Sequence, residues 1–239
     1  MNTIICKDPY ELAVRCAEEF RKLIAAKPDA LICLPAGSSS VDTYRVLAEL
    51  HRKGEIDFSG ARFVALDEWL DLEDESENCN AFMWRNFYGP LSIRTEQLVT
   101  FDIHAADMEK ECKRIDDYIF SCGGIDLMLL GIGRNGHLGL NEPHVPWDCY
   151  CVDVALDDTT KTIGQKYFSQ STVLTRGITL GIRHILESRR VVLQAYGPEK
   201  AEIIGKLLDT HPHPCLPASC LKLHRDAWLI IDEAANARP

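Results

Sequence analysis

The sequence predicts an α/β fold: a single Rossmann-like domain over residues 1–239, with a mostly parallel sheet and helices on both of its faces. Short apolar runs alternate along the chain with stretches whose apolar residues recur at the helical period. No Pro/Ser-rich linker, repeat or low-complexity tract divides the chain. Strands that alternate with helices form mainly parallel sheets that are covered on both sides, and this pattern favours the predicted fold class.

Three elements open the predicted sheet. The apolar run at 30–34 predicts a buried strand, and the polar loop 35–40 ends it. Apolar residues then recur at helical spacing over 41–54, which is typical of an amphipathic helix that stops at its final glycine. A second apolar run at 61–66 predicts another strand, and a polar segment follows it directly.

Two helices and a strand are expected in the middle of the chain. The segment 81–88 has helical character and is ended by a Gly-Pro pair. A charged amphipathic pattern predicts a helix at 107–120, which two consecutive glycines close. The apolar strand expected at 125–130 runs into a glycine-rich loop at 131–137.

The alternation continues to the end of the chain. An alternating run at 151–156 predicts a half-exposed strand, and a helix is expected at 158–168. The last three predicted elements are a strand at 191–195, a helix over 197–208 and a strand at 227–231. In sheets of this kind ligands bind beyond the carboxyl ends of the strands, so the loops there are candidates for function.

Composition argues against several classes of protein. The chain carries 26 basic and 36 acidic residues, a net charge of −10, which argues against nucleic acid as a partner. No apolar run is long enough to span a membrane, and the amino-terminal segment lacks the apolar stretch of a secretory signal. Ten scattered cysteines without a Cys-x-x-Cys pair predict reduced thiols that mostly fill the core. A cytoplasmic protein without a membrane partner is therefore expected.

The loop after the first predicted strand fits an anion site. Gly37 allows a tight turn, and Ser38, Ser39 and Ser40 offer hydroxyl and amide groups at the start of the next helix. The loop lacks the Gly-Lys-Ser/Thr ending of a nucleotide-binding loop, so ATP or GTP is not implied. The alternative is an ordinary helix N-cap by serine.

A carboxylate pair, Asp67-Glu68, begins the loop expected after the strand at 61–66. A carboxylate at the end of a strand can serve as a general base, a metal ligand or a hydrogen-bond acceptor. The alternative is two solvated acids on a loop, because most carboxylates of proteins are simply exposed.

The third loop, 131–136, fits the dinucleotide pattern G-x-G-x-x-G after a strand. Further helix-breaking residues follow within a few positions, so no helix that could hold a pyrophosphate can start there. NAD binding is therefore rejected. The loop leads to His137, the side chain best suited to proton transfer near neutral pH, and to Glu142, which can orient it. The alternatives are a structural histidine, or a metal site built from Asp67, His137 and Glu142.

The segment 130–143, LGIGRNGHLGLNEP, resembles the signature of the glucosamine-6-phosphate deaminase/isomerase family, which shares a superfamily with the 6-phosphogluconolactonases. The resemblance extends to LPAGSS at 34–39, LDEW at 66–69 and SCLKLH at 219–224, and so covers nearly the whole chain. The Asn-Glu-Pro ending is similar to that of the deaminases rather than the lactonases. The resemblance implies conversion of a phosphorylated amino sugar and water to a ketose 6-phosphate and ammonium, with no metal or organic cofactor.

The resemblance also implies roles for single residues. Asp67 matches the carboxylate that moves a proton between C2 and C1 of the opened sugar. His137 matches the residue that assists ring opening, and Glu142 matches the acid paired with that histidine. The residues implied in phosphate binding are Gly37, Ser38, Ser39, Lys166 and Lys200. Relatives assemble as monomers, dimers or hexamers, so a homo-oligomer is left open.

One position departs from the family pattern. Glucosamine-6-phosphate deaminases usually carry aspartate where this chain has Asn135, whose amide cannot take a proton or carry charge. The amide can still orient His137 or bind a hydroxyl group, and this form of the motif resembles the galactosamine-6-phosphate branch. The expected substrate is therefore galactosamine 6-phosphate or glucosamine 6-phosphate. Two other functions stay open: a 6-phosphogluconolactonase, and a sugar-phosphate sensor that binds without turnover.

Overall fold

The computed structural model describes residues 1–237 and places a seven-stranded sheet at the centre of the molecule. The strand order is β1-β10-β9-β6-β2-β3-β5, and all neighbouring pairs are parallel. The strands are β1 Asn2–Cys6, β2 Leu31–Leu34, β3 Arg62–Ala65, β5 Leu98–Val99, β6 Leu127–Leu130, β9 Arg190–Ala195 and β10 Ala227–Asp232. The predicted α/β fold with a mostly parallel sheet is confirmed, and the strands expected near 30, 61, 125, 191 and 227 all belong to this sheet.

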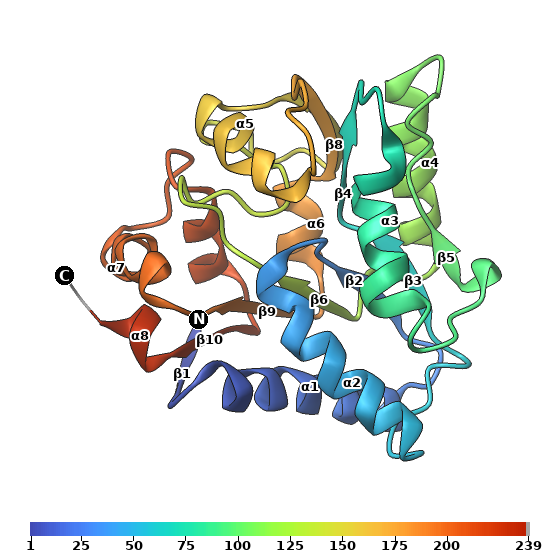
Figure 1. The fold of residues 1–239 in the computed structure, drawn as a ribbon, viewed down its shortest axis with the longest axis vertical. Helices are drawn as coiled ribbons and strands as arrows, with labels where there is room; N and C mark the ends of the chain where they lie inside the picture. Colours follow the sequence, from blue (N-terminus) through green and yellow to red (C-terminus); the bar gives the residue numbers. More distant parts are fainter. Residues whose placement is uncertain (238–239) are drawn as a thin grey trace.

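Helices cover both faces of the sheet, as predicted (Figure 1). Along β2, Leu31 and Cys33 pack into the core on one face, while Ile32 and Leu34 pack into the core on the other. The first core includes α4 Met108–Ser121, α6 Ile182–Glu187 and α7 Ala201–Asp209, and the second includes α1 Pro9–Ala26, α2 Val41–Arg52 and α3 Cys79–Met83. The structure also contains α5 Asp158–Gly164 and α8 Glu233–Asn236.

The first 26 residues form a strand and a helix that the sequence analysis does not anticipate. Edge strand β1 pairs with β10, and α1 begins at Pro9 after Asp8, whose carboxylate accepts the amide hydrogen of Glu11. An acidic N-cap followed by proline is a typical helix start. The helix buries Cys16 and Phe20, which lie one turn apart. The mixture of charged and apolar residues at the amino terminus is therefore the pattern of an amphipathic helix.

A second, antiparallel sheet of three strands has the order β4-β8-β7. Its strands are β4 Asp67–Leu70, β7 Cys151–Ala155 and β8 Arg176–Leu180. The expectation that Asp67 begins a loop is wrong, because β4 starts there, with only Leu66 between it and β3. This strand forms by pairing with β8, more than a hundred residues further along the chain, and local sequence does not report such a partner.

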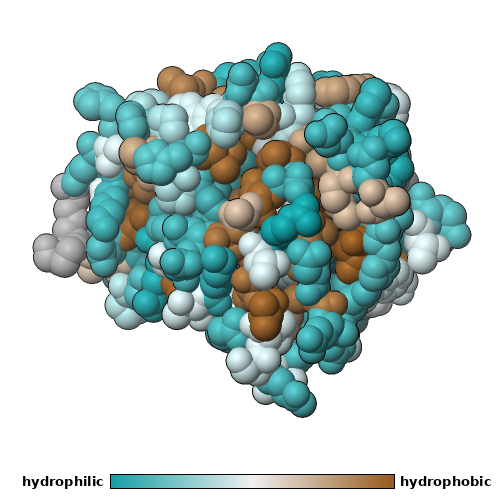
Figure 2. All heavy atoms as spheres, turned by 90° about the horizontal axis from the view of Figure 1, so that it is seen from above, coloured by the Kyte–Doolittle hydropathy of each residue, from teal (hydrophilic) through white to brown (hydrophobic). Residues whose placement is uncertain are grey.

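The remaining expectations about the middle of the chain agree with the structure. No helix lies between residues 131 and 143, and the helix expected at 158–168 is α5 followed by a 3₁₀ turn, η5 Gln165–Tyr167. All ten cysteines are free, and six are buried. Within residues 1–237 no helix combines the length and the apolar character needed to cross a membrane. Seen from above, the surface is largely hydrophilic, with apolar side chains gathered near the middle (Figure 2).

Candidate functional site

A cleft of about 410 Å³ opens at the carboxyl ends of four parallel strands. Its walls come from the segments that follow β2, β3, β6 and β9, together with α5 and η5. All three segments that the sequence analysis singled out line this one cleft. Their meeting follows from topology, because parallel strands of one sheet end at the same edge.

Asp67 lines the cleft at the point where β3 passes into β4. Burial and, to a smaller extent, the charge of the neighbouring Glu68 raise the pKa of the Asp67 carboxyl group to about 7. A carboxyl group that titrates near neutral pH can both accept and return a proton in one catalytic cycle. Asp67 therefore has the chemistry of a general base.

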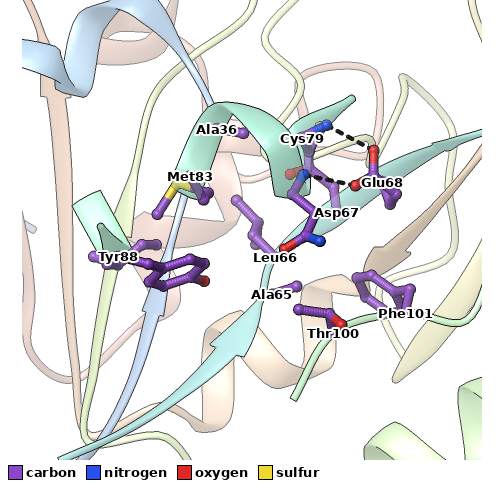
Figure 3. Close-up of a pocket in the computed structure, with 12 residues that line it drawn as sticks. Ala36, Ala65, Leu66, Asp67, Glu68, Cys79, Met83, Tyr88, Thr100 and Phe101 are labelled. Atoms are coloured by element: carbon purple, nitrogen blue, oxygen red, sulfur yellow. Dashed lines mark hydrogen bonds between the residues drawn. The ribbon is translucent and has the colours of Figure 1, made fainter. Parts of the chain in front are cut away.

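Glu68 is a structural carboxylate, and the expectation of two solvated acids is wrong for it. Only 4% of Glu68 is exposed. Its Oε1 accepts hydrogen bonds from the backbone amides of Trp69 and Cys79, and its Oε2 accepts one from the amide of Asn80, each at 2.8 Å. Figure 3 shows how Glu68 is tied to the start of α3 beside a small internal cavity that Asp67 also lines. These bonds fix β4, and with it Asp67, against α3.

His137 lines the same cleft and is supported by two side chains. Its Nδ1 lies 3.0 Å from Thr160 Oγ1 and 3.4 Å from Glu142 Oε2. Burial favours a raised pKa for Glu142, but hydrogen bonds from His137, Thr160 and Asn135, together with the charge of His137, outweigh burial and lower this pKa. The imidazole is thus backed by an ionised carboxylate, an arrangement suited to acid–base catalysis.

Glycines let the loop after β6 close tightly around His137. The Gly133 amide donates a hydrogen bond to the His137 carbonyl at 3.1 Å, and Gly136 adopts a φ of 84° between them. A Cβ atom on Gly133 would lie only 2.4–2.6 Å from three atoms of the imidazole. The glycines of the G-x-G-x-x-G pattern therefore make room for a histidine and not for a dinucleotide.

Replacing Gly133 by alanine is expected to lower kcat by about 100-fold, because the new methyl group must push the imidazole out of position. Steady-state kinetics measures the loss. The matched control is Gly205→Ala in α7, where an added Cβ meets nothing within 4 Å. Wild-type kcat in Gly133→Ala, in a protein that still folds, would refute the close contact.

Three cations line the cleft near one another: Lys166, Lys200 and Arg134. Burial, followed by the charges of Lys166 and Arg134, lowers the pKa of Lys200 to about 8. Burial and the charge of Arg134 also lower the pKa of Lys166. The Lys200 ammonium donates a hydrogen bond to the carbonyl of Ile132 at 2.6 Å, which ties it to the loop after β6. Like charges held this close favour a bound anion such as a phosphate.

The serine-rich loop lies on the same cleft through Gly37, Ser38 and Ser39. Residues Ser38–Ser40 form a 3₁₀ turn, η1, that leads directly into α2. The turn does begin at Gly37, whose carbonyl accepts the Ser40 amide hydrogen at 3.0 Å, but its φ of −163° is ordinary extended backbone that any residue can adopt. The serine N-cap is not observed, since Ser40 makes no capping bond and instead accepts a hydrogen bond from Gln194. The start of the helix is therefore suited to an anion.

The cleft unites most of the residues that the sequence singled out. Those in its wall are Gly37, Ser38, Ser39, Asp67, Asn135, His137, Lys166 and Lys200. Glu142 lies behind His137 and is 5% exposed. For the metal alternative, no group of three or more His, Cys, Asp or Glu residues within 1–237 is placed to hold a metal ion.

Three residues at the site are not predicted from the sequence. Thr160 contacts His137, and Asp157 is the N-cap of α5. Arg134 lines the cleft together with the two lysines, Lys166 and Lys200. An aspartate directly before a predicted helix is a recognisable capping signal, and Arg134 stands within the glycine-rich loop itself. Thr160 carries no such signal, because nothing in the sequence shows which face of α5 meets the histidine.

Comparison with known proteins identifies relatives over the whole length of the chain. Residues 9–230 match the family model described as glucosamine-6-phosphate isomerases/6-phosphogluconolactonase. The glucosamine-6-phosphate deaminase of Bacillus pumilus (strain SAFR-032) is 39% identical over 239 residues, which cover 99% of each chain. The solved structure of a monomeric glucosamine-6-phosphate deaminase is similar with a TM-score of 0.94 and 33% identity, over 99% of both chains. The 6-phosphogluconolactonase of Leishmania guyanensis shares the fold, with a TM-score of 0.77 and 19% identity over 98% of this chain and 97% of that one.

Proposed function

Because the chain belongs to the family of glucosamine-6-phosphate isomerases and 6-phosphogluconolactonases, we propose that it is an amino-sugar-6-phosphate deaminase. It would convert a 2-amino-2-deoxyhexose 6-phosphate and water into a ketose 6-phosphate and ammonium. The observation that carries the proposal is the single cleft that holds Asp67, His137 and the cations Lys166 and Lys200. Relatives that are glucosamine-6-phosphate deaminases match nearly the whole chain at 39% and 33% identity, which supports this activity over lactone hydrolysis.

In the proposed first step His137 opens the sugar ring. The imidazole moves a proton from the hydroxyl on C1 to the ring oxygen O5, which breaks the C1–O5 bond and leaves an aldehyde at C1. Glu142, an ionised carboxylate 3.4 Å from Nδ1, stabilises the imidazole when it carries the extra proton. Thr160 fixes the orientation of the ring from the same side.

In the second step the Asp67 carboxylate removes the proton from C2 and returns it to C1. The electrons of the C2–H bond form the C1–C2 double bond, and the carbonyl oxygen on C1 takes up a proton from the 2-ammonium group, which gives an enolamine. Protonation at C1 by Asp67 then converts this intermediate to an iminium ion at C2. Water adds to C2, and the resulting carbinolamine expels the amine as ammonia, which is released as ammonium. One base that reaches two adjacent carbons suffices for the transfer, and a pKa near 7 suits it to that task.

The phosphate group would occupy the other part of the cleft. The cations Lys166, Lys200 and Arg134 and the start of η1 are the groups there that favour an anion. Anchoring the phosphate places C1 and C2 of an opened six-carbon sugar at a fixed reach from the anion site. Binding energy from the phosphate is thereby used to orient the reacting carbons.

The proposal is tested by ammonium release from glucosamine 6-phosphate and galactosamine 6-phosphate, with the ketose 6-phosphate measured in the same samples. We expect ammonium and ketose phosphate in equal amounts, with glucosamine 6-phosphate as a substrate because the named relatives act on it. The ratio of kcat/KM for the two sugars decides whether galactosamine 6-phosphate is the preferred substrate. The two sugars differ only in one hydroxyl orientation.

The control is Asp29→Asn, a change of an exposed carboxylate outside the cleft, which should leave both rates at the wild-type level. Hydrolysis of 6-phosphogluconolactone without ammonium release from either amino sugar would overturn the proposal in favour of a lactonase. Tight binding of both sugars without turnover of any of the three compounds would instead indicate a sensor.

The rate is expected to fall with decreasing pH through about 7. The pKa of Asp67 is raised, so its carboxylate form, the active base, is lost below about pH 7, whereas an ordinary aspartate stays ionised down to about pH 4. A pH profile of kcat/KM measures this acid limb, which belongs to the free enzyme or the free substrate. An acid limb near pH 4, where an ordinary aspartate titrates, would count against Asp67 as the base.

A further inference from the structure

The side chain of Asn135 connects two carboxylates that come from different segments of the chain. Its Nδ2 donates a hydrogen bond of 2.8 Å to Glu142 Oε2 and a longer one of 3.5 Å to Asp157 Oδ1. Its Oδ1 accepts the backbone amide hydrogen of His137 at 3.2 Å. Both donor hydrogens and the acceptor oxygen of this amide are thus used within the site.

Asp157 is joined to Glu142 a second time, through the backbone. The amide of Asp157 donates a hydrogen bond to Glu142 Oε1 at 3.2 Å. The carboxylate of Asp157 accepts the amide hydrogen of Thr159 at 2.8 Å, as the N-cap of α5. Glu142 is therefore linked to the start of α5 both directly and through Asn135.

The first turn of α5 contains Thr160, whose hydroxyl lies 3.0 Å from His137 Nδ1 and which is 4% exposed. The same segment continues into η5 with Lys166. A displacement of the helix start would therefore move the groups that support the imidazole. Asp157 is well placed to prevent it, because it is anchored at both its backbone and its side chain.

We propose that Asp157 is a positioning residue for the ring-opening pair His137 and Glu142, and that the uncharged side chain of Asn135 links Asp157 to Glu142. The catalytic part of this inference rests on the proposed function. An acid at 135 would place a third carboxylate 2.8 Å from Glu142 and 3.5 Å from Asp157, where the structure has a donor. Removing the carboxylate at 157 would relieve the 3.5 Å contact and offer the acid at 135 a new donor, while the 2.8 Å contact with Glu142 would remain.

The test is a double-mutant cycle of Asn135→Asp, Asp157→Asn and the protein that carries both changes. Asn135→Asp is expected to lower kcat/KM by about 100-fold, because a third negative charge is placed beside Glu142 and Asp157 where the structure has a donor. Asp157→Asn should cost about fivefold, since asparagine is an equally good N-cap and only the charge and the bridge are lost. The double variant should recover part of this loss, to about tenfold below wild type, because the amide introduced at position 157 gives the acid at 135 a donor while its contact with Glu142 remains.

A second measurement separates positioning from a general loss of structure. An open-chain amino-alditol 6-phosphate, used as a competitive inhibitor, needs no ring opening. Its inhibition constant should stay within about threefold of wild type in all four proteins while kcat changes. Losses that simply multiply in the double variant, or wild-type activity in Asn135→Asp, would overturn the proposal.

A failure of this positioning proposal can be distinguished from a failure of the proposed deaminase function. A wild-type protein that releases no ammonium from either amino sugar refutes the function but leaves the cycle measurable in thermal unfolding. The midpoint should then drop by several degrees in Asn135→Asp and recover in the double variant, because about 1 kcal/mol corresponds to a few degrees in a domain of this size. A midpoint that does not recover would show that the two positions are not coupled.

Discussion

Replacing Asp67 by asparagine is expected to lower kcat by about 1,000-fold or more while KM changes by less than about threefold. The amide has nearly the shape of the carboxylate but cannot accept the C2 proton. The phosphate contacts proposed for Lys166 and Lys200 are untouched, so the substrate should still bind. Steady-state kinetics of ammonium release, together with direct binding of the substrate to the variant, measures both effects.

The matched control for this variant is again Asp29→Asn, which makes the same chemical change outside the cleft. The substitution also removes one of two neighbouring carboxylates, so Asp67→Asn should unfold at a temperature no lower than wild type. A loss of binding that matches the loss of turnover would mean that Asp67 holds the substrate and is not its base.

Replacing His137 by asparagine is expected to lower kcat/KM by about 100-fold, a smaller loss than at Asp67, because sugar rings also open slowly without a catalyst. The rate-limiting step should also change in this variant. In wild type, a substrate deuterated at C2 should react more slowly, since Asp67 must break that bond. In His137→Asn, ring opening limits the rate, and the isotope effect on kcat/KM should fall towards one.

The isotope effect tests the role of His137 in ring opening whatever the size of the loss in kcat/KM. Asparagine at 137 keeps a side-chain donor, so the buried carboxylate of Glu142 need not lose every partner. Asp67→Asn provides the comparison, because it slows the C2 step and should preserve a full isotope effect. An undiminished isotope effect in His137→Asn would show that the histidine does not act in ring opening.

The sequence was sufficient to predict the parallel sheet and most of the cleft. Apolar runs such as that ending at Leu34 form buried strands because both faces of the sheet are covered, and their length and flanking glycines are local signals. The carboxyl ends of parallel strands meet at one edge, so Ser38, Asp67 and His137 could be expected together from topology. The phosphate-binding role expected of Lys166 and Lys200 follows only from the family resemblance, and the structure shows that both lysines line the cleft.

What the sequence could not predict are interactions between distant segments. Glu68 looks like any exposed acid, and only the position of α3 makes it a buried acceptor of three amide hydrogens. Strand β4 exists because β8 pairs with it. The link from Asn135 to Asp157 spans 22 residues and depends on how α5 returns to the cleft. Such contacts are set by tertiary packing, which local propensity does not report.

The most direct test of the account is a crystal structure of the protein with an open-chain amino-alditol 6-phosphate. We predict a phosphate in contact with Lys166 and Lys200, C1 and C2 beside the Asp67 carboxylate, and the hydroxyl on C5 directed at His137. These three contacts, made by one ligand, would place the base and the ring-opening group on the same substrate. A ligand that binds with Asp67 and His137 on separate surfaces, or outside this cleft, would contradict the account.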